Sequence, residues 1–254
     1  MTLPGVELVK TPGGAFLTLS TDTVIPRALK AEGGFERHLA QIATEVYRHY
    51  RGRAGVLVDV GANIGTFSVP VARATGCSVV TFEAQRVISQ LLGANLVING
   101  IERGWVRNVI LGAPGHEPVL HVPQVDYGQQ GNFGAYAVDR SLFESQSLSR
   151  MRSLHETEAV QVHTLDDFNL ADVFLIKIDV EGAELDVLRG AVRTLERNQF
   201  PPLLFETWRD DWWQPKRDAL LSFVEQLGYD VTAMDENYFA QHRTSLSRIE
   251  LELA

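Results

Sequence analysis

The sequence predicts an α/β fold in which a mostly parallel sheet is flanked by helices. From residue 56 onward, short runs rich in Val, Ile and Leu alternate with stretches of helical periodicity. Parallel neighbours need a long connection and usually take a helix for it, so this alternation favours right-handed crossovers. With 254 residues, of which 45% are hydrophobic and 22% charged, the chain can bury a substantial core.

The main domain is expected to span residues 51–254. Its expected strands are 56–60, 79–82, 106–111, 173–178 and 203–205, followed by a terminal pair at 230–234 and 248–253. Its expected helices lie near 63–75, 86–99, 182–197 and 216–227. The segment near 119–154 interrupts this alternation with Gly, Gln, Asn and Ser, which is typical of a surface insertion that can shape a substrate site.

Residues 1–50 are expected to form an extension packed on the main domain. Two short strands, 6–9 and 15–19, flank the turn-forming residues 11–14. Leu39, Ile42, Ala43 and Val46 then recur at helical spacing after a Gly-Gly break.

Composition excludes several classes of protein. A net charge of −9 argues against nucleic-acid binding, which needs a basic surface. The single cysteine, Cys77, allows neither an internal disulfide nor a cysteine-based zinc site. The chain shows no signal-peptide pattern and no apolar run of membrane-spanning length, so we expect a cytoplasmic protein without membrane or nucleic-acid partners.

The strongest local signal is a glycine-containing turn that follows the first parallel strand. Such a turn exposes amide donors at the carboxyl edge of the sheet, where open α/β folds bind ligands. The dinucleotide pattern G-x-G-x-x-G is incomplete here, and the carboxylate of Asp59 would repel a pyrophosphate but attract the ammonium and sulfonium of S-adenosylmethionine. The residues expected to bind this cofactor are Asp59, Gly61, Ala62, Asn63, Gly65 and Thr66.

Glu83 supports the same interpretation. It ends the 79–82 strand and follows Gly65 by 18 residues. An acid about 20 residues after the glycine turn is placed to accept hydrogen bonds from ribose hydroxyls. Ala84 is then expected beside the adenosine. A solvated strand end is the alternative for Glu83 alone.

Several motifs together resemble the FkbM family of S-adenosylmethionine-dependent methyltransferases, over roughly residues 56–206. They are VDVGANIGTF at 58–67, FE at 82–83, NL and NG at 95–96 and 99–100, TLDD at 164–167, and IKIDVEGAE with VLRGA at 176–184 and 187–191. The resemblance implies a class I Rossmann-like sheet, mostly parallel with an antiparallel C-terminal strand, and O-methylation of a small molecule or glycan. The family commonly has proline after the Glu83 position, where this chain has Ala84.

Three carboxylates are the expected catalytic residues. Asp179 and Glu181 follow the 173–178 strand and Glu206 follows 203–205, so all three belong to the edge that carries Gly61 and Glu83. A hydroxyl acceptor must lose a proton, which calls for a base within hydrogen-bond reach. Helix capping is the alternative for Asp179 and Glu181, and a satisfied strand end is the alternative for Glu206.

Other possibilities stay open from the sequence alone. The carboxylates could hold a divalent cation, although no residue is assigned as a metal ligand. Lys177 is either paired with a carboxylate or turned outward, and any of three histidines could be the base instead: His116, His121 and His163. Trp208, Trp212 and Trp213 could line an acceptor pocket or form a packing or homo-oligomer surface. Rival functions are a nicotinamide-dependent oxidoreductase, a non-catalytic cofactor-binding module, and methylation of nitrogen.

Overall fold

A seven-stranded sheet forms the centre of the protein in the computed structural model, which describes residues 5–50, 55–135, 152–245 and 248–249. The strand order is β11-β12-β10-β9-β3-β4-β5. The strands are β3 (Val56–Val60), β4 (Ser78–Phe82), β5 (Gly104–Arg107), β9 (Val173–Ile178), β10 (Leu203–Glu206), β11 (Tyr229–Met234) and β12 (Asn237–His242). The five strands from β10 to β5 are parallel, whereas β12 runs antiparallel to β10 and β11. The predicted mostly parallel sheet is confirmed.

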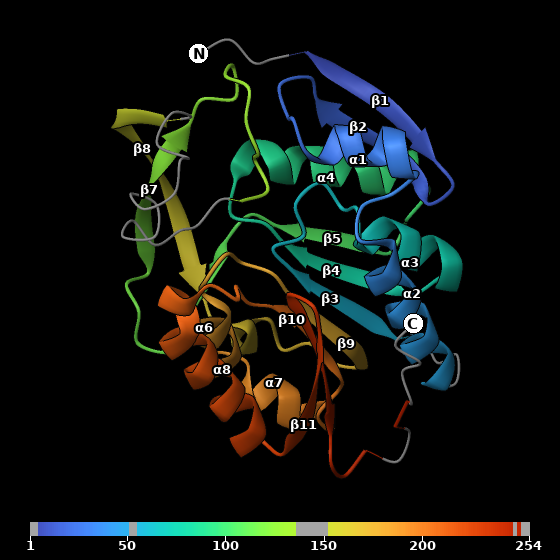
Figure 1. The fold of residues 1–254 in the computed structure, drawn as a ribbon, viewed down its shortest axis with the longest axis vertical. Helices are drawn as coiled ribbons and strands as arrows, with labels where there is room; N and C mark the ends of the chain where they lie inside the picture. The colour runs from blue at the N-terminus through green and yellow to red at the C-terminus, as the bar shows by residue number, and fades with distance from the viewer. Residues whose placement is uncertain (1–4, 51–54, 136–151, 246–247, 250–254) are drawn as a thin grey trace.

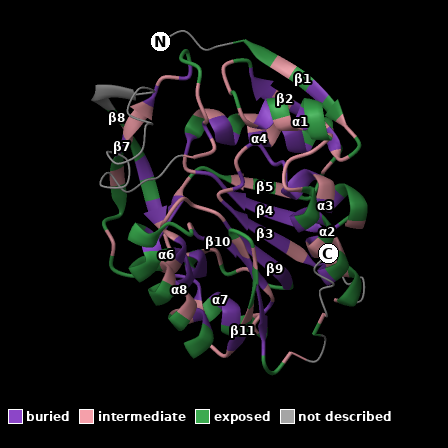
Figure 2. Ribbon diagram, viewed as in Figure 1, coloured by how far each residue is buried: buried purple, intermediate pink, exposed green. Residues whose placement is uncertain are grey.

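Helices cover both faces of this sheet (Figure 1). One face packs against α2 (Arg37–His49), α3 (Ser68–Thr75) and α4 (Arg86–Ile98), and the other against α6 (Glu184–Arg189), α7 (Val192–Arg197) and α8 (Gln214–Gln226). Side chains alternate between the two cores, because Leu57 faces the first and Val58 and Val60 face the second. Figure 2 shows that the central strands are buried, as parallel strands covered on both faces must be.

The N-terminal elements pack on the α3–α4 side of the sheet. Strands β1 (Val6–Thr11) and β2 (Gly14–Leu19) form the hairpin that the turn residues predict, and α2 corresponds to the predicted amphipathic helix. A further helix, α1 (Ile25–Glu32), was not predicted. Across the part of the chain that is described, no helix has both the length and the apolar character needed to cross a membrane.

The segment near 119–154 contributes to a second sheet. Strand β8 (Arg152–His163) lies between β7 (Val119–Val125) and β6 (Ile110–Leu111). Residues 136–151 of the predicted insertion lie outside the described residues. The expected strand 106–111 divides into β5 and β6, because Asn108 turns out of the central sheet and donates from Nδ2 to the carbonyls of Glu83 and Ala84, both at 2.8 Å.

Two expected helices differ from the structure. The helix predicted at 63–75 begins only at Ser68, because Asn63 and Gly65 adopt left-handed backbone conformations that a right-handed helix cannot include. The helix predicted at 182–197 is broken after Arg189 into α6 and α7. The carboxylate of Asp166 accepts hydrogen bonds from the amides of Arg193 (3.1 Å) and Thr194 (2.6 Å), which starts α7 as a separate helix. Short 3₁₀ turns occur at Leu165–Phe168 and Asp211–Trp213.

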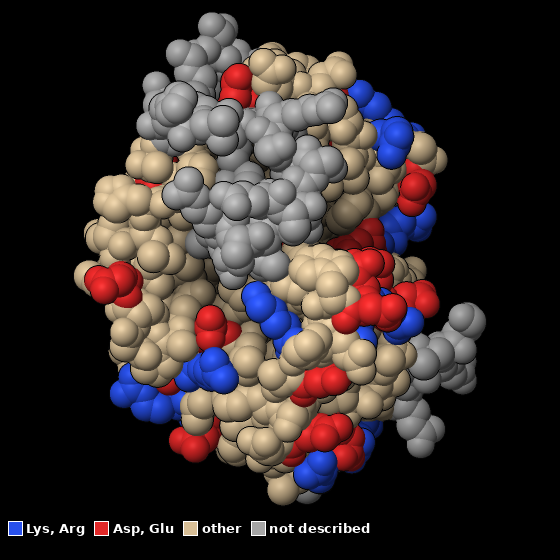
Figure 3. Space-filling model, turned by 60° about the vertical axis from the view of Figure 1, so that its left-hand side comes forward, with Lys and Arg blue, Asp and Glu red and all other residues tan. Residues whose placement is uncertain are grey.

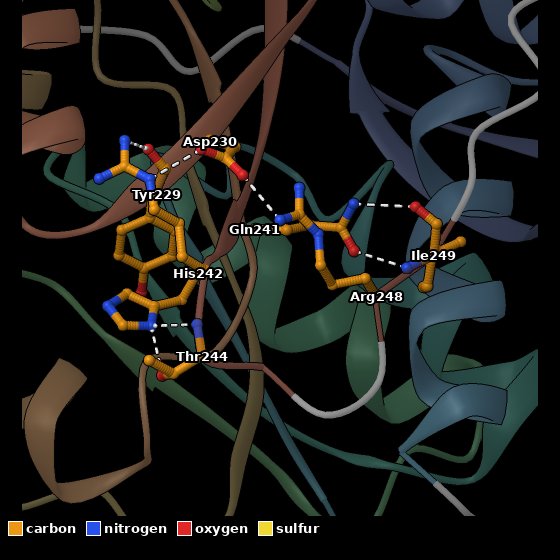
Figure 4. Close-up of polar contacts among 8 residues, drawn as sticks. Tyr229, Asp230, Gln241, His242, Thr244, Arg248 and Ile249 are labelled. Atoms are coloured by element: carbon orange, nitrogen blue, oxygen red, sulfur yellow. Dashed lines mark hydrogen bonds and ion pairs between the residues drawn. The ribbon is translucent and has the colours of Figure 1, made fainter.

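Of the terminal strand predicted at 248–253, only residues 248–249 are described, and they are not in a strand; the partner of β11 is β12 at Asn237–His242. Asp235, with φ 55°, and Glu236 make the tight turn between them. Figure 4 shows how the following chain is held without a strand ladder: the Gln241 amide exchanges two hydrogen bonds with the backbone of Ile249, and the Asp230 carboxylate accepts one from Arg248. Residues 250–254 lie outside the description.

Asn95 of α4 and Asn99, which follows the last residue of α4, join the N-terminal hairpin to the main domain. Asn95 accepts the Leu17 amide at 2.7 Å and donates to the carbonyls of Leu17 (3.2 Å) and Ile64 (2.9 Å). Asn99, one helical turn further, exchanges two hydrogen bonds with the backbone of Ala15. The side-chain amides of Asn95 and Asn99 therefore pair with the backbone of β2 as a neighbouring strand would. Asn95 also holds the glycine turn in place through its hydrogen bond to the Ile64 carbonyl.

We expect Asn95→Ala to lower the free energy of unfolding by about 2–3 kcal/mol, because Asn95 is fully buried and three backbone groups would lose their partner. Asn99→Ala is the matched control and should cost about 1 kcal/mol, since Asn99 is half-buried and water can replace its amide. Urea unfolding of both variants measures the difference. Equal losses in the two variants would contradict the larger contribution assigned to the hydrogen bonds of Asn95.

Candidate active site

A cavity of about 300 Å³ opens at the carboxyl edge of the central strands. It brings together most of the predicted site residues from four separate segments. Those that line it are Gly61, Ala62, Asn63, Thr66, Glu83, Ala84, Asp179, Glu181 and Glu206. Segments that follow β3, β4, β9 and β10 therefore meet at one place, as the parallel topology requires.

Asp59 and Gly65 differ from their expected placement, because neither lines the cavity. Asp59 is fully buried on the face of β3 that packs against α3. Its Oδ2 accepts a hydrogen bond from the Ser68 hydroxyl, and its Oδ1 has no partner among the described residues. Gly65 has φ 90°, and a Cβ there would lie 2.9 Å from Leu92 Cδ1. Both residues therefore support the glycine turn by packing against helices, on the side away from the cavity.

The glycine turn and the acidic turn are in direct backbone contact. Gly61 has φ 78°, and a Cβ there would overlap the carbonyl oxygen of Asp179. The amide of Asp179 donates to the carbonyl of Val60 at 2.9 Å. Glycine at position 61 is therefore required by the approach of Asp179, which fixes the two turns relative to each other.

Glu83 combines a carboxylate with an apolar wall. Its oxygens accept the amides of Asn63 (3.0 Å) and Gln85 (2.8 Å), and each keeps a further lone pair. Burial raises the pKa of Glu83 to about 7, against the lowering effect of the two amides. Apolar residues line the cavity nearby: Phe82, Val109, Ile110 and Leu111. A carboxylate that accepts hydrogen bonds fits the ribose hydroxyls of S-adenosylmethionine, and the apolar wall beside it fits the adenine base.

Lys177 is the one cationic residue among the described residues that line the cavity. Its Nζ lies 2.9 Å from Asp179 Oδ2, and in the sheet register Lys177 is opposite Asp59. Burial lowers the pKa of Lys177, but the carboxylates of Asp179, Asp59 and Glu36 outweigh burial, so the net shift is upward. The lysine is paired with a carboxylate, which was one of the two arrangements considered from the sequence.

Glu181 and Glu206 are protonated more readily than ordinary glutamates. Burial, with the charges of Asp179 and Glu206, raises the pKa of Glu181 to about 9. Burial, with the charges of Asp179 and Glu36, raises the pKa of Glu206 to about 8, while Lys177 opposes the shift. Helix capping, the alternative for Asp179 and Glu181, is not observed, because α6 begins without a side-chain cap; the carboxylate of Glu184 accepts the Gly182 amide at 2.8 Å and holds the turn before the helix.

Two further acids line the cavity that sequence reasoning missed. Glu36 precedes α2 with φ 46°, and Glu236 lies in the β11–β12 turn. No motif marks either residue. Glu236 could have been found only if the sequence had placed β12 at 237–242, which makes Glu236 a turn residue at the edge of the sheet. Six acidic residues in all line the described wall, against Lys177 alone. Acidic side chains also gather on the right-hand side of the face drawn in Figure 3.

The insertion reaches the cavity through Gln85. The Gln85 amide nitrogen Nε2 donates to the carbonyl of Phe133 at 2.8 Å, and the Tyr127 hydroxyl donates to Gln85 Oε1 at 3.2 Å. Gln85 also donates its backbone amide to Glu83. Asn132, Gly134 and Ala135 of this segment line the cavity wall.

The remaining candidates from the sequence lie elsewhere. None of the three histidines considered as a base lines the cavity. Trp208 and Trp213 border a small recess with Asp179, Glu181 and Glu206, whereas Trp212 is 54% exposed. Within the described ranges, no group of three or more His, Cys, Asp or Glu side chains has the arrangement of a metal site.

The sheet order, its one reversed strand and a cavity at the carboxyl edge define the class I methyltransferase fold. The chain belongs to the FkbM methyltransferase family, whose domain matches residues 59–231.

The chain is similar to curated methyltransferases and to solved structures. Methyltransferase sdnD of Sordaria araneosa is 29% identical over 203 residues, which are 69% of this chain and 74% of the relative. Methyltransferase 1 of Beauveria bassiana is 32% identical over 147 residues, 53% of this chain and 57% of the relative. The crystal structure of methyltransferase FkbM from Methylobacillus flagellatus is 19% identical, with a TM-score of 0.49 over 74% of this chain and 44% of that one.

The raised pKa values predict that stability falls as pH rises. Glu83, Glu181, Glu184 and Glu206 bind a proton more tightly when folded, with pKa values of about 7 to 9 against an ordinary 4.5. Between the ordinary pKa and these folded values the unfolded chain releases the protons while the folded chain keeps them, so stability falls over this range and levels off above the folded pKa values. We expect Tm to be lower at pH 9 than at pH 6.5 by on the order of 5 °C.

The double variant Glu181→Gln/Glu206→Gln should show a smaller decrease, and Glu102→Gln, at an exposed position, should behave as the wild type. Differential scanning calorimetry across this pH range is the measurement. A Tm that stays constant or rises with pH would contradict the assignment of buried, readily protonated acids.

Proposed function

We propose that the protein is an S-adenosylmethionine-dependent methyltransferase that methylates a hydroxyl oxygen of a small molecule or glycan. One observation carries this proposal: the cavity combines Glu83, placed to accept ribose hydroxyls, with the acids Asp179, Glu181 and Glu206. Family membership supports methyl transfer, and the incomplete dinucleotide pattern disfavours a nicotinamide cofactor.

The cofactor would be held by the glycine turn and by the end of β4. Gly61, Ala62, Asn63 and Thr66 line one side, and Glu83 and Ala84 line another. Asn63 has φ 50° and its amide is bonded to Glu83, so the turn and the carboxylate are organised together. Bound there, S-adenosylmethionine supplies an electrophilic methyl group and accepts the bonding electrons at sulfur.

The acidic wall favours a methyl acceptor that is a hydroxyl group and that carries no negative charge near the reacting oxygen. Carboxylates accept hydrogen bonds from hydroxyl groups and repel phosphate or carboxylate groups. Nothing in this wall requires a nucleic-acid or membrane partner, and we extend the proposal to a small-molecule acceptor that diffuses to the cavity.

The acids would divide their roles. Asp179, whose carboxylate is ion-paired with Lys177, would orient the acceptor hydroxyl. Glu206, with its pKa raised to about 8, would take up the hydroxyl proton, because a base works best when its pKa is near the working pH. Glu181, with a pKa of about 9, would be protonated near neutral pH and would donate a hydrogen bond.

S-adenosylmethionine and S-adenosylhomocysteine should both stabilise the protein, by roughly 2.7 kcal/mol at 100 times Kd, and NADH should not. Glu83→Gln should weaken both by about tenfold, since one charge-assisted hydrogen bond to the ribose is lost, and Glu102→Gln should not. Thermal unfolding with each ligand is the measurement. A shift with NADH alone would instead favour an oxidoreductase.

Glu206→Gln should lower kcat by about 10²-fold without changing the Kd of S-adenosylhomocysteine, because the proton acceptor is lost and the cofactor wall is kept. The wild-type kcat should rise with pH through about 8, and this rise should be absent in the variant. Methyl incorporation, with mass spectrometry to separate O- from N-methyl products, provides the readout. Full activity in Glu206→Gln would remove Glu206 as the base, and cofactor binding without any turnover would favour a binding module.

A further inference from the structure

A second cavity, of about 600 Å³, lies between the N-terminal elements and helices α2 and α3. In Figure 1 these are the β1–β2 hairpin, with α1, and the two helices next to it on the right-hand side. Its volume is within the range of small-molecule sites, roughly 300–1,000 Å³, whereas the main cavity is at the lower limit of that range. Neither the predicted catalytic acids nor Lys177 line it.

The floor of this cavity is apolar and fixed by packing. Phe16 and Leu29, 1% and 2% exposed, line it and also belong to the main core. The other apolar residues in its wall are Pro12, Phe35, Ala40, Pro70 and Ala74. Because the floor is part of the folded core, the cavity exists before any ligand binds, and it suits an apolar molecule.

Helix α2 supplies a polar rim to the same cavity. Arg37, Gln41, Thr44, Glu45 and Arg48 recur at intervals of three or four residues, so they share one side of the helix. Arg48 is paired with Glu45, whereas Arg37 donates only to the carbonyl of Glu32, at 3.3 Å, within the described part of the chain. Among the described residues, the rim therefore offers Arg37 as a cation without a carboxylate partner.

Two residues are shared by the walls of the two cavities. Phe35 and Thr66 line both, and Thr66 belongs to the glycine turn. Glu36, the next residue after Phe35, faces the main cavity. With cofactor in the 300 Å³ main cavity, little room is left there for more than the reacting group of an acceptor.

We propose that the second cavity binds the apolar body of the methyl acceptor, whose reactive hydroxyl reaches the main cavity beside Phe35 and Thr66. The ligand class is an apolar molecule with an anionic or hydrogen-bond-accepting group for Arg37. This proposal rests on the proposed function, but the cavity can be tested by itself.

The probe is dodecanoate, measured by its displacement of 1-anilinonaphthalene-8-sulfonate from the full chain. We expect one dodecanoate per chain, with Kd raised about tenfold by Thr44→Trp and by Ala40→Phe, which fill the cavity, and about fivefold by Arg37→Gln. His38→Trp, exposed on the same helix and outside both cavities, is the matched control and should leave Kd unchanged. No binding to the wild type, or equal binding to Thr44→Trp, would overturn the proposal.

S-adenosylhomocysteine binding, followed by calorimetry, separates this proposal from the proposed function. All four variants should bind it with wild-type affinity, which also shows that they fold. For any acceptor that is methylated, Thr44→Trp should raise its KM about tenfold with little change in kcat or in the KM of S-adenosylmethionine. An acceptor whose KM is unchanged would overturn the acceptor role. Dodecanoate binding without any binding of S-adenosylhomocysteine would overturn the proposed function and leave a site for apolar ligands.

Discussion

The ion pair between Lys177 and Asp179 is the interaction around which the site is built. It lies at the end of the central strand β9, and Lys177 is buried opposite Asp59 of β3. Removing one partner of a buried pair leaves an uncompensated charge and commonly costs 3–5 kcal/mol. The ammonium offsets part of the surrounding negative charge, while burial together with the charge of Asp179 raises the pKa of Glu83, Glu181 and Glu206.

Rigid contacts hold this charged set in place. The missing Cβ of Gly61 lets the Asp179 backbone approach the glycine turn, so the ends of β3 and β9 are in direct backbone contact. Asn95 ties the same turn to the N-terminal hairpin through Ile64 and Leu17. A site that must hold several like charges close together benefits from such backbone anchoring, because the charges alone would push the segments apart.

The sequence allows prediction of the parallel sheet and most of the cavity wall for a simple reason. Parallel strands buried on both faces are continuous apolar runs, and the residues that follow them share one edge of the sheet. Asp59 was expected in the cavity, but it lies inside β3, where side chains alternate between the two faces of the sheet. Val58 and Val60 face one core, and Asp59 faces the other, where it contacts Ser68 of α3. Glu36 and Glu236 could not be assigned, because one depends on how the extension packs and the other on the register of β11 with β12.

The residues around the main cavity also separate by origin. The wall next to Glu83 lies within the matched family domain of 59–231, whereas Glu36 and Glu236 lie outside it. The second cavity is formed mostly by residues before 59, with Thr66, Pro70 and Ala74 as the contribution of the family domain. If cofactor binding belongs to the shared domain and the second cavity binds the acceptor, then selection of the acceptor falls mostly to the extension that precedes residue 59.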